Sequence, residues 1–206
     1  MDERYSYQDL RDIVTKLRSK DGCPWDMKQT HESLLPNLLE ETYEVIDAIQ
    51  NKDMDAMKEE LGDLLLQIVF HSDLASETDS FTMDDVVDRV VNKLIYRHPH
   101  VFDNKVEAHT DEEVMNNWEK LKRKEKHMST YTEVLESIPK VLPSLVRAYK
   151  TQKKASDVGF DWNDYQPIIN KLHEEISEVT EAIDGGDKHK IEEEIARLNR
   201  TIVSPN

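Results

Sequence analysis

The stretch LLEETYEVIDAIQNKDMDAMKEELGDLLLQIVFH, residues 38–71, joins two apolar helical patterns through a short polar break. In each pattern the apolar side chains recur at intervals of three and four residues, which is typical of one buried face of a helix. The first pattern spans residues 32–50 and carries Leu35, Leu38, Leu39, Thr42, Val45, Ile46 and Ile49. The second spans residues 54–72 and carries Met57, Leu61, Leu64, Leu65, Ile68 and Val69. The sequence therefore predicts two helices that pack antiparallel as a hairpin.

Helical patterns continue through the rest of the chain, and no segment alternates with period two for long enough to predict a strand. Further helices are expected over residues 5–20, 83–97, 111–127, 143–156 and 165–184, and from about residue 189 toward Pro205. Thr82 and Asp85 predict a capping box at the start of the helix over 83–97. Only five glycines in 206 residues also favour long helices. The predicted fold class is all-α.

The composition is strongly acidic, with a formal net charge of −16 and 34% charged against 37% hydrophobic residues. Such a charge repels the nucleic-acid backbone, so no nucleic-acid partner is expected. The modest apolar content suits an oligomer that buries part of each helix stripe between subunits. Cys23 is the only cysteine, which excludes an intrachain disulfide and a thiolate cluster and fits a reducing compartment. The polar start of the chain and the lack of an apolar run of about 20 residues lead us to expect a cytoplasmic protein with no membrane partner.

Four carboxylates of the hairpin are spaced to converge on one place. Glu41 and Glu44 lie three residues apart on one helix face, and so do Glu60 and Asp63. Antiparallel packing would bring the two pairs together, and clustered carboxylates repel one another unless a cation lies among them. Magnesium is the usual cation for carboxylates beside phosphates, with manganese as a substitute. The pattern therefore predicts a metal site at these four acids, and the alternative interpretation is a solvated helix face.

Such a site suits the hydrolysis of a triphosphate. The cation would neutralise the phosphates and lower the pKa of a water that attacks the α-phosphorus, which releases pyrophosphate and leaves a monophosphate. A spare carboxylate would act as general base, and both Glu40 and Glu44 are candidates. The predicted catalytic set is Glu40, Glu41, Glu44, Glu60 and Asp63.

Basic and aromatic residues outside the hairpin are candidates for substrate binding. Lys93 and Arg97 lie four residues apart on one helix face and can reach the same anion. Trp118 lies among cations that include Lys122, which suits a contact with a base or ribose, and Trp25 is a second stacking candidate. The alternatives are ordinary surface charges for the cations and core or dimer-interface anchors for the two tryptophans.

The hairpin pattern occurs a second time along the chain. Counterparts 134 positions apart are Glu41 and Glu175, Glu44 and Glu178, and Glu60 and Glu194. A tryptophan turn precedes each copy, GCPWD at 22–26 and GFDW at 159–162, and this shared register indicates a duplicated domain. The fourth acid, Asp63, is replaced by Arg197, so the second site is expected to be inactive. We therefore expect residues 1–128 to form a domain with a complete acidic site, and residues 129–206 to form a linker and a truncated, degenerate second copy.

Several blocks of the sequence resemble the MazG family of nucleoside triphosphate pyrophosphohydrolases. They are GCPWD (22–26), LLEETYEVIDAI (38–49), KEELGDLLLQIVFH (58–71), RHPHVF (97–102), NWEKLKRKEK (117–126) and VGFDW (158–162). The resemblance covers about residues 8–195. It is strong because these blocks occur in order and at the spacing typical of the family. It implies an all-α helical bundle, dimeric and duplicated, that hydrolyses ribo- or deoxyribonucleoside triphosphates with magnesium.

The resemblance also assigns roles to particular residues. It implies metal ligands at Glu41, Glu44, Glu60 and Asp63, a phosphate-binding pair at Lys93 and Arg97, and a nucleotide contact at Trp118. Two other functions stay open at this point. One is a weakly active or inactive nucleotide-binding or dimerisation module, because the second site is lost. The other is hydrolysis of a different phosphate ester such as phosphoribosyl-ATP.

Overall fold

The computed structural model describes residues 4–103, 108–159 and 164–202, and every regular element within those ranges is a helix. The predicted all-α fold is confirmed. The chain divides into two compact units, Met1–Glu107 and Ala108–Asn206. This division is based on compactness and does not test the domain boundary predicted from the sequence repeat. The boundary between residues 128 and 129 therefore stays a prediction.

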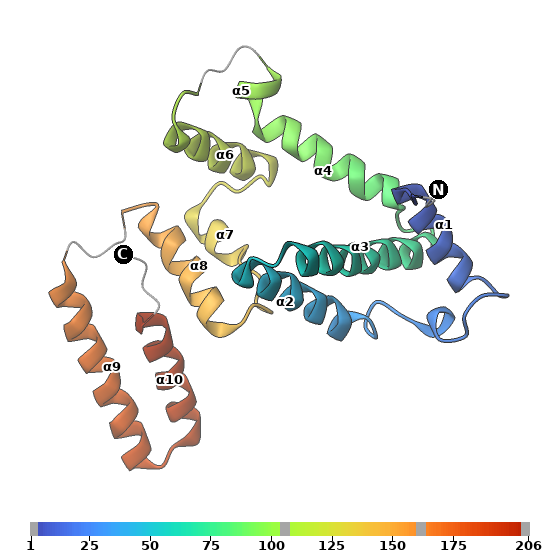
Figure 1. The fold of residues 1–206 in the computed structure, drawn as a ribbon. Helices are drawn as coiled ribbons and strands as arrows, with labels where there is room; N and C mark the ends of the chain where they lie inside the picture. The colour runs from blue at the N-terminus through green and yellow to red at the C-terminus, as the bar shows by residue number, and fades with distance from the viewer. Residues whose placement is uncertain (1–3, 104–107, 160–163, 203–206) are drawn as a thin grey trace. The chain divides into compact units, whose positions relative to one another are not determined.

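The first unit is organised around a long helical hairpin (Figure 1). Its elements are α1 (Tyr7–Arg18), the short 3₁₀ turn η1 (Asp26–Lys28), α2 (Leu35–Asn51), α3 (Met54–Ser76), α4 (Met83–Arg97) and α5 (Pro99–Phe102). The hairpin turns at Lys52, which ends α2 in the left-handed conformation with φ 57°. Asp53 then caps α3 by accepting hydrogen bonds from the backbone of Asp55 and Ala56. The predicted capping box of Thr82 and Asp85 is present at the start of α4.

The apolar core of the first unit lies where α1 and the segment before α2 meet α3. It consists of Val14, Leu34, Val69, Phe70 and Leu74, with Leu10, Leu65 and Leu66 packed against it. Full burial of a side chain of this size contributes about 1.5–3 kcal/mol. This core therefore fixes α1 and the loop after it against the C-terminal half of α3.

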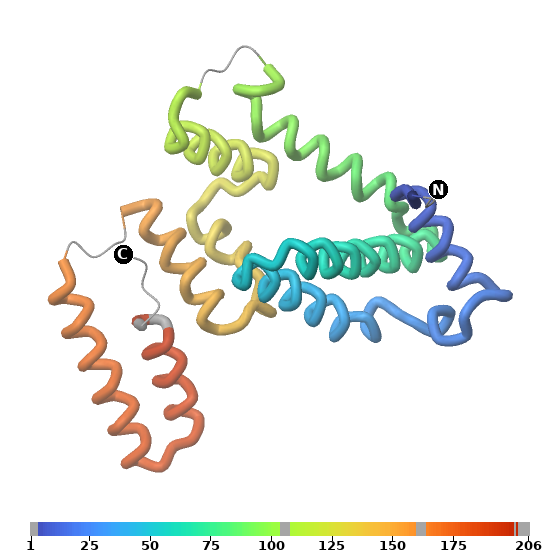
Figure 2. The backbone as a smooth tube through the Cα atoms, viewed as in Figure 1, coloured from blue at the N-terminus to red at the C-terminus, as the bar shows by residue number. Residues whose placement is uncertain are grey.

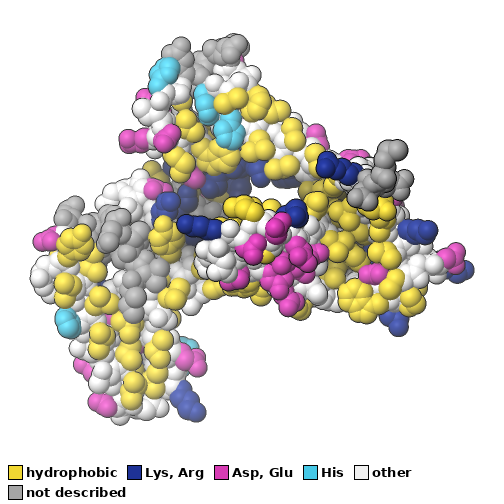
Figure 3. All heavy atoms as spheres, in the orientation of Figure 1, with side chains coloured by type: hydrophobic (Ala, Val, Ile, Leu, Met, Phe, Trp, Pro, Cys, Tyr) yellow, Lys and Arg dark blue, Asp and Glu magenta, His cyan; other side chains and the backbone are white. Residues whose placement is uncertain are grey.

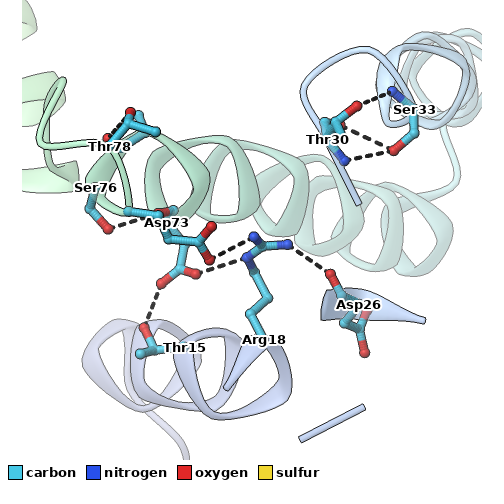
Figure 4. A network of polar contacts seen from close by, with 10 residues as sticks. Thr15, Arg18, Asp26, Thr30, Ser33, Asp73, Ser76 and Thr78 are labelled. Atoms are coloured by element: carbon cyan, nitrogen blue, oxygen red, sulfur yellow. Dashed lines mark hydrogen bonds and ion pairs between the residues drawn. The ribbon is translucent and has the colours of Figure 1, made fainter. Parts of the chain in front are cut away.

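A buried arginine adds polar contacts beside that core (Figure 4). Arg18 donates to Asp73 over 3.0 Å, to the backbone carbonyl of Asp26 over 2.7 Å and to Glu77 over 2.7 Å. Thr15 donates to the other carboxylate oxygen of Asp73 over 2.6 Å. These contacts tie α1, η1 and α3 together through one charged group.

The predicted buried stripe of α2 is only partly buried within one chain. Val45 and Ala48 are buried, but Leu35, Leu39, Ile46 and Ile49 are 57%, 58%, 41% and 55% exposed. The side of α2 that faces α3 carries Leu38, Glu41, Val45 and Ala48. The apolar face of α2 is therefore broader than a single partner helix covers, and burial of these four residues between subunits stays a prediction.

The second unit also contains a helical hairpin, formed by its last two helices. Its elements are α6 (Asp111–Glu125), α7 (Tyr131–Glu136), α8 (Ser144–Ser156), α9 (Tyr165–Gly185) and α10 (Lys188–Ile202). Figure 2 shows α9 and α10 side by side, with the turn between them at Gly186, whose φ is 71°. Glu119 of α6 pairs with Lys154 of α8 over 2.6 Å, which joins those two helices.

The stretch expected to be a linker contains a helix. Thr130 and Glu133 form a capping box that starts α7, and Val134 of this helix is buried. The second tryptophan turn, Phe160 to Trp162, and the last residues from Val203 onward lie outside the described residues. None of the helices within the described ranges is long and apolar enough to cross a membrane.

Candidate active site

The antiparallel hairpin brings three of the predicted metal ligands together. Carboxylate oxygens of Glu41 on α2 and of Glu60 and Asp63 on α3 all lie within 4.8 Å of one another. Glu41 stands on the side of α2 that faces α3, between Leu38 and Val45. Asp and Glu side chains accordingly gather in a dense patch over the hairpin (Figure 3).

Repulsion between the carboxylates of this cluster makes the negatively charged form of each one less favourable. Burial raises the pKa of Glu41, and the charges of Asp63 and Glu44 raise it further. Burial likewise raises the pKa of Glu60, with added repulsion from Glu44, Glu59 and Asp63. Because the folded chain holds these negative charges close together, a divalent cation among them would relieve the repulsion.

The two remaining acids of the predicted catalytic set lie beside the three clustered carboxylates. Glu44 is close enough for its charge to raise the pKa of both Glu41 and Glu60. It also lines a shallow hollow of about 230 Å³ near the hairpin turn, together with Glu60, Asp47 and Asp53. Glu40 is exposed, and its charge adds to the raised pKa of Glu41. The acids predicted from the sequence are therefore neighbours in the fold.

The predicted substrate-binding residues are spread over other elements. Lys93 is half-buried and Arg97 is buried near the C-terminal end of α4. An ion pair of 2.7 Å between Arg11 and Asp84 holds the N-terminal end of α4 against α1. Figure 1 shows α4 diverging from α3 toward its C-terminal end, so the approach of Lys93 and Arg97 to the acids stays a prediction.

The predicted aromatic contacts also remain predictions. Trp25 lies just before η1 in the first unit and is 59% exposed. Trp118 and Lys122 lie on α6 in the second unit, where Lys122 pairs with Glu119 over 3.1 Å.

One histidine pair near the hairpin was missed by the sequence analysis. The Nδ1 atoms of His31 and His71 lie 2.8 Å apart, and the two rings stack with centroids 5.1 Å apart. Burial lowers the pKa of His71, and the neighbouring His31 lowers it further. His71 continues the row of Glu60, Leu64 and Gln67 along α3, and that spacing was the available signal.

Comparison with known proteins identifies the family. Residues 29–102 match the MazG nucleotide pyrophosphohydrolase domain. The nucleoside triphosphate pyrophosphohydrolase/pyrophosphatase MazG of Thermotoga maritima is 45% identical over 198 residues, which cover 96% of this chain and 74% of that protein. The chain belongs to the MazG family. The nucleoside triphosphate pyrophosphohydrolase of Escherichia coli is 43% identical over 192 residues, 92% of this MazG chain and 73% of the relative.

The family assignment confirms the resemblance seen in the sequence and makes this MazG protein a hydrolase. A nucleoside triphosphate pyrophosphohydrolase of Mycolicibacterium smegmatis is 38% identical over 149 residues, 71% of this chain and 45% of that protein. The segment that matches the family domain contains the whole of α2 to α5. It therefore includes the acidic cluster, Lys93 and Arg97, whereas Trp25, Trp118 and Lys122 lie outside it.

Proposed function

We propose that the chain hydrolyses nucleoside triphosphates to a nucleoside monophosphate and pyrophosphate, with magnesium held by the hairpin acids. The observation that carries the proposal is the convergence of carboxylate oxygens from Glu41, Glu60 and Asp63 within 4.8 Å in a chain of the MazG family. The relatives from Thermotoga maritima and Escherichia coli are named for this activity, which supports the proposal.

The donor set fits a hard divalent cation. All the converging atoms are carboxylate oxygens, which magnesium and manganese prefer over softer ligands. Glu44, whose charge acts on Glu41 and Glu60, would be the fourth ligand of the proposed set with Glu41, Glu60 and Asp63. When bound, the cation would neutralise the triphosphate charge and increase the acidity of the attacking water.

The residues of the chain would carry the rest of the reaction. A water oxygen attacks the α-phosphorus, the bond from this phosphorus to the oxygen bridging to the β-phosphorus breaks, and pyrophosphate leaves. Glu40 or Glu44 accepts the proton of the attacking water. Both carboxylates lie beside the cluster, and neither is one of its three converging acids. Lys93 and Arg97 would bind phosphate oxygens, and Trp25, Trp118 and Lys122 would contact the nucleoside end or its phosphates.

A homodimer would account for the apolar surface of the first unit. The outer face of α2 exposes Leu39 and Ile49 at 58% and 55%, and α4 exposes Val91 and Ile95 at 44% and 45%. Exposed apolar helix faces are typical of protein interfaces. A second copy of the chain packed on these faces would bury them. We further propose a cytoplasmic location, with which the free thiol of Cys23 is compatible.

Product analysis in isotopically labelled water tests the proposal. We would incubate the chain with ribo- and deoxyribonucleoside triphosphates and with phosphoribosyl-ATP, with magnesium or with a chelator. The expected products are one pyrophosphate and one monophosphate per turnover, with the labelled oxygen in the monophosphate and no reaction in chelator. Formation of a diphosphate and orthophosphate, or of labelled pyrophosphate, would contradict attack at the α-phosphorus.

The same experiment separates an enzyme from a module that only binds. If calorimetry detects magnesium-dependent nucleotide binding while no substrate is turned over, the alternative of an inactive nucleotide-binding or dimerisation module holds.

A further inference from the structure

The second hairpin contains an acidic cluster in the same register as the first. Carboxylate oxygens of Glu175 and Glu178 on α9 and of Glu194 on α10 lie within 4.8 Å of one another. These residues stand 134 positions after Glu41, Glu44 and Glu60. The acids that would hold a cation in the first hairpin therefore have close counterparts in the second.

The second cluster differs from the first in having cations of its own. The Arg197 guanidinium donates to both oxygens of Glu194 over 3.2 and 3.1 Å, and to Glu193 over 2.9 Å. On the other helix, the Lys171 ammonium lies 3.1 Å from Glu175 and 2.8 Å from Glu174. The residues at the corresponding positions of the first hairpin are Asp63 and Asn37, neither of which is positive.

Burial separates the two clusters as well. Glu175 and Glu194 are each only 4% exposed, whereas Glu41 and Glu60 are half-buried. A buried carboxylate needs a counter-charge, because isolation from water strongly disfavours its charged form. Arg197 and Lys171 supply that charge from within the same two helices.

The ligand atoms that remain do not fit a magnesium ion. Both oxygens of Glu194 and one oxygen of Glu175 already face a side-chain cation. The ligand atoms that remain are Oε2 of Glu175, which is buried without a hydrogen-bond partner among the described residues, and the carboxylate of Glu178, which also lies in the field of the Arg197 charge. An added divalent cation would also stand beside the Arg197 guanidinium and be repelled by it.

We propose that Arg197 and Lys171 act as built-in counter-cations that replace a metal ion in the second hairpin. The α9–α10 cluster is then a metal-independent structural element, and any divalent cation bound by this chain occupies the α2–α3 cluster. The inference goes beyond the proposed function, because it concerns a different group of residues.

Manganese binding to the full chain, followed by electron paramagnetic resonance, tests this inference. The first cluster is disabled with Glu60→Gln and Asp63→Asn, and this double variant is expected to bind no manganese at a specific site. Adding Lys171→Asn and Arg197→Asp gives the second hairpin the residues of the first at both positions. We expect this quadruple variant to gain one manganese site per chain, with unchanged helix content by circular dichroism.

Either of two results from the manganese experiment would overturn the inference. One is a manganese site that persists in the double variant and disappears when Glu178→Gln is added. The other is a folded quadruple variant that gains no site. If the quadruple variant does not fold, the thermal unfolding temperature of the double variant decides, because excess magnesium should leave it unchanged and an increase would overturn the inference. A wild-type chain that binds no manganese would contradict the proposed function. The comparison of the double variant with the quadruple variant would still test the inference.

Discussion

The Nε atom of Arg18 donates a hydrogen bond to Oδ2 of Asp73 over 3.0 Å, and the two side chains are only 3% and 13% exposed. The same guanidinium holds the backbone carbonyl of Asp26, so the turn that follows Trp25 is fastened to α3. This ion pair joins the start of the chain to the helix that carries Glu60 and Asp63. It is therefore part of the frame that supports the acidic cluster.

Replacing Arg18 with methionine should strongly destabilise the first unit. The change leaves Asp73 nearly buried without its counter-charge, which typically costs about 3–5 kcal/mol. Arg11→Met is the matched control, because its partner Asp84 is 77% exposed and such surface pairs contribute at most about 1 kcal/mol. Urea unfolding of both variants measures the difference, and equal losses of stability would show that the Arg18 network contributes no more than a surface pair.

Removing one charge from the acidic cluster should stabilise the metal-free chain. The pKa of Glu41 and of Glu60 is raised by burial and then by neighbouring carboxylates, so these acids bind protons more tightly in the folded state. The stabilisation that comes from this tighter proton binding is fully present below the ordinary pKa of 4.5. It is lost as the pH rises through the raised pKa of each acid. In chelator at neutral pH, Asp63→Asn should therefore raise the thermal unfolding temperature, and magnesium should stabilise the wild type more than the variant.

Asp55→Asn is the control for that comparison. Asp55 lies on the same helix, is 95% exposed and pairs only with Lys58 among the ion pairs of the described residues. A rise in unfolding temperature in both variants would indicate a general effect of net charge and not relief of repulsion within the cluster.

The pair of His31 and His71 should make stability fall in mildly acidic solution. Burial, followed by the charge of His31, lowers the pKa of His71 below its ordinary 6.5. As the pH falls, the unfolded chain therefore binds this proton at a higher pH than the folded chain does. The contribution of neutral His71 to stability is fully present above pH 6.5 and is lost as the pH falls through the lowered pKa. Double protonation would also remove the acceptor from the 2.8 Å contact between the two Nδ1 atoms.

Denaturant unfolding between neutral and mildly acidic pH measures this dependence in the wild type and in His71→Gln. The variant should lose the part of the slope that belongs to this window. An unchanged slope would assign the pH dependence to other groups.

The structure shows which features the sequence pattern could predict and which it could not. The spacing of Glu41, Glu60 and Asp63 predicted their convergence, because helix periodicity and a short hairpin turn are local properties. The contact of Arg18 with Asp73 joins residues 55 positions apart and depends on how α1 crosses α3, which no local pattern describes. The sequence did not predict which residues of the apolar stripe, such as Leu35 and Ile49, stay exposed within one chain, since periodicity identifies an apolar face without saying what covers it.

Lys93→Ala should weaken catalysis if Lys93 binds a phosphate of the substrate. Loss of one donor to a phosphate in an active site lowers kcat/KM by roughly 100-fold. Lys58→Ala is the control, since Lys58 is 78% exposed and pairs with the exposed Asp55. Steady-state kinetics of both variants decide the assignment, and a Lys93→Ala enzyme with wild-type kcat/KM would identify Lys93 as a surface charge.

The most direct test of the account is magnesium-dependent pyrophosphate release from a nucleoside triphosphate by the wild type, Asp63→Asn and Asp55→Asn. Removal of a carboxylate from the metal cluster should reduce release by roughly 100-fold or more, because a catalytic metal supplies several kcal/mol of transition-state stabilisation. Asp55→Asn should keep wild-type release, and circular dichroism should show all three proteins folded. Full magnesium-dependent release by folded Asp63→Asn would contradict the assignment of the active site to the α2–α3 hairpin.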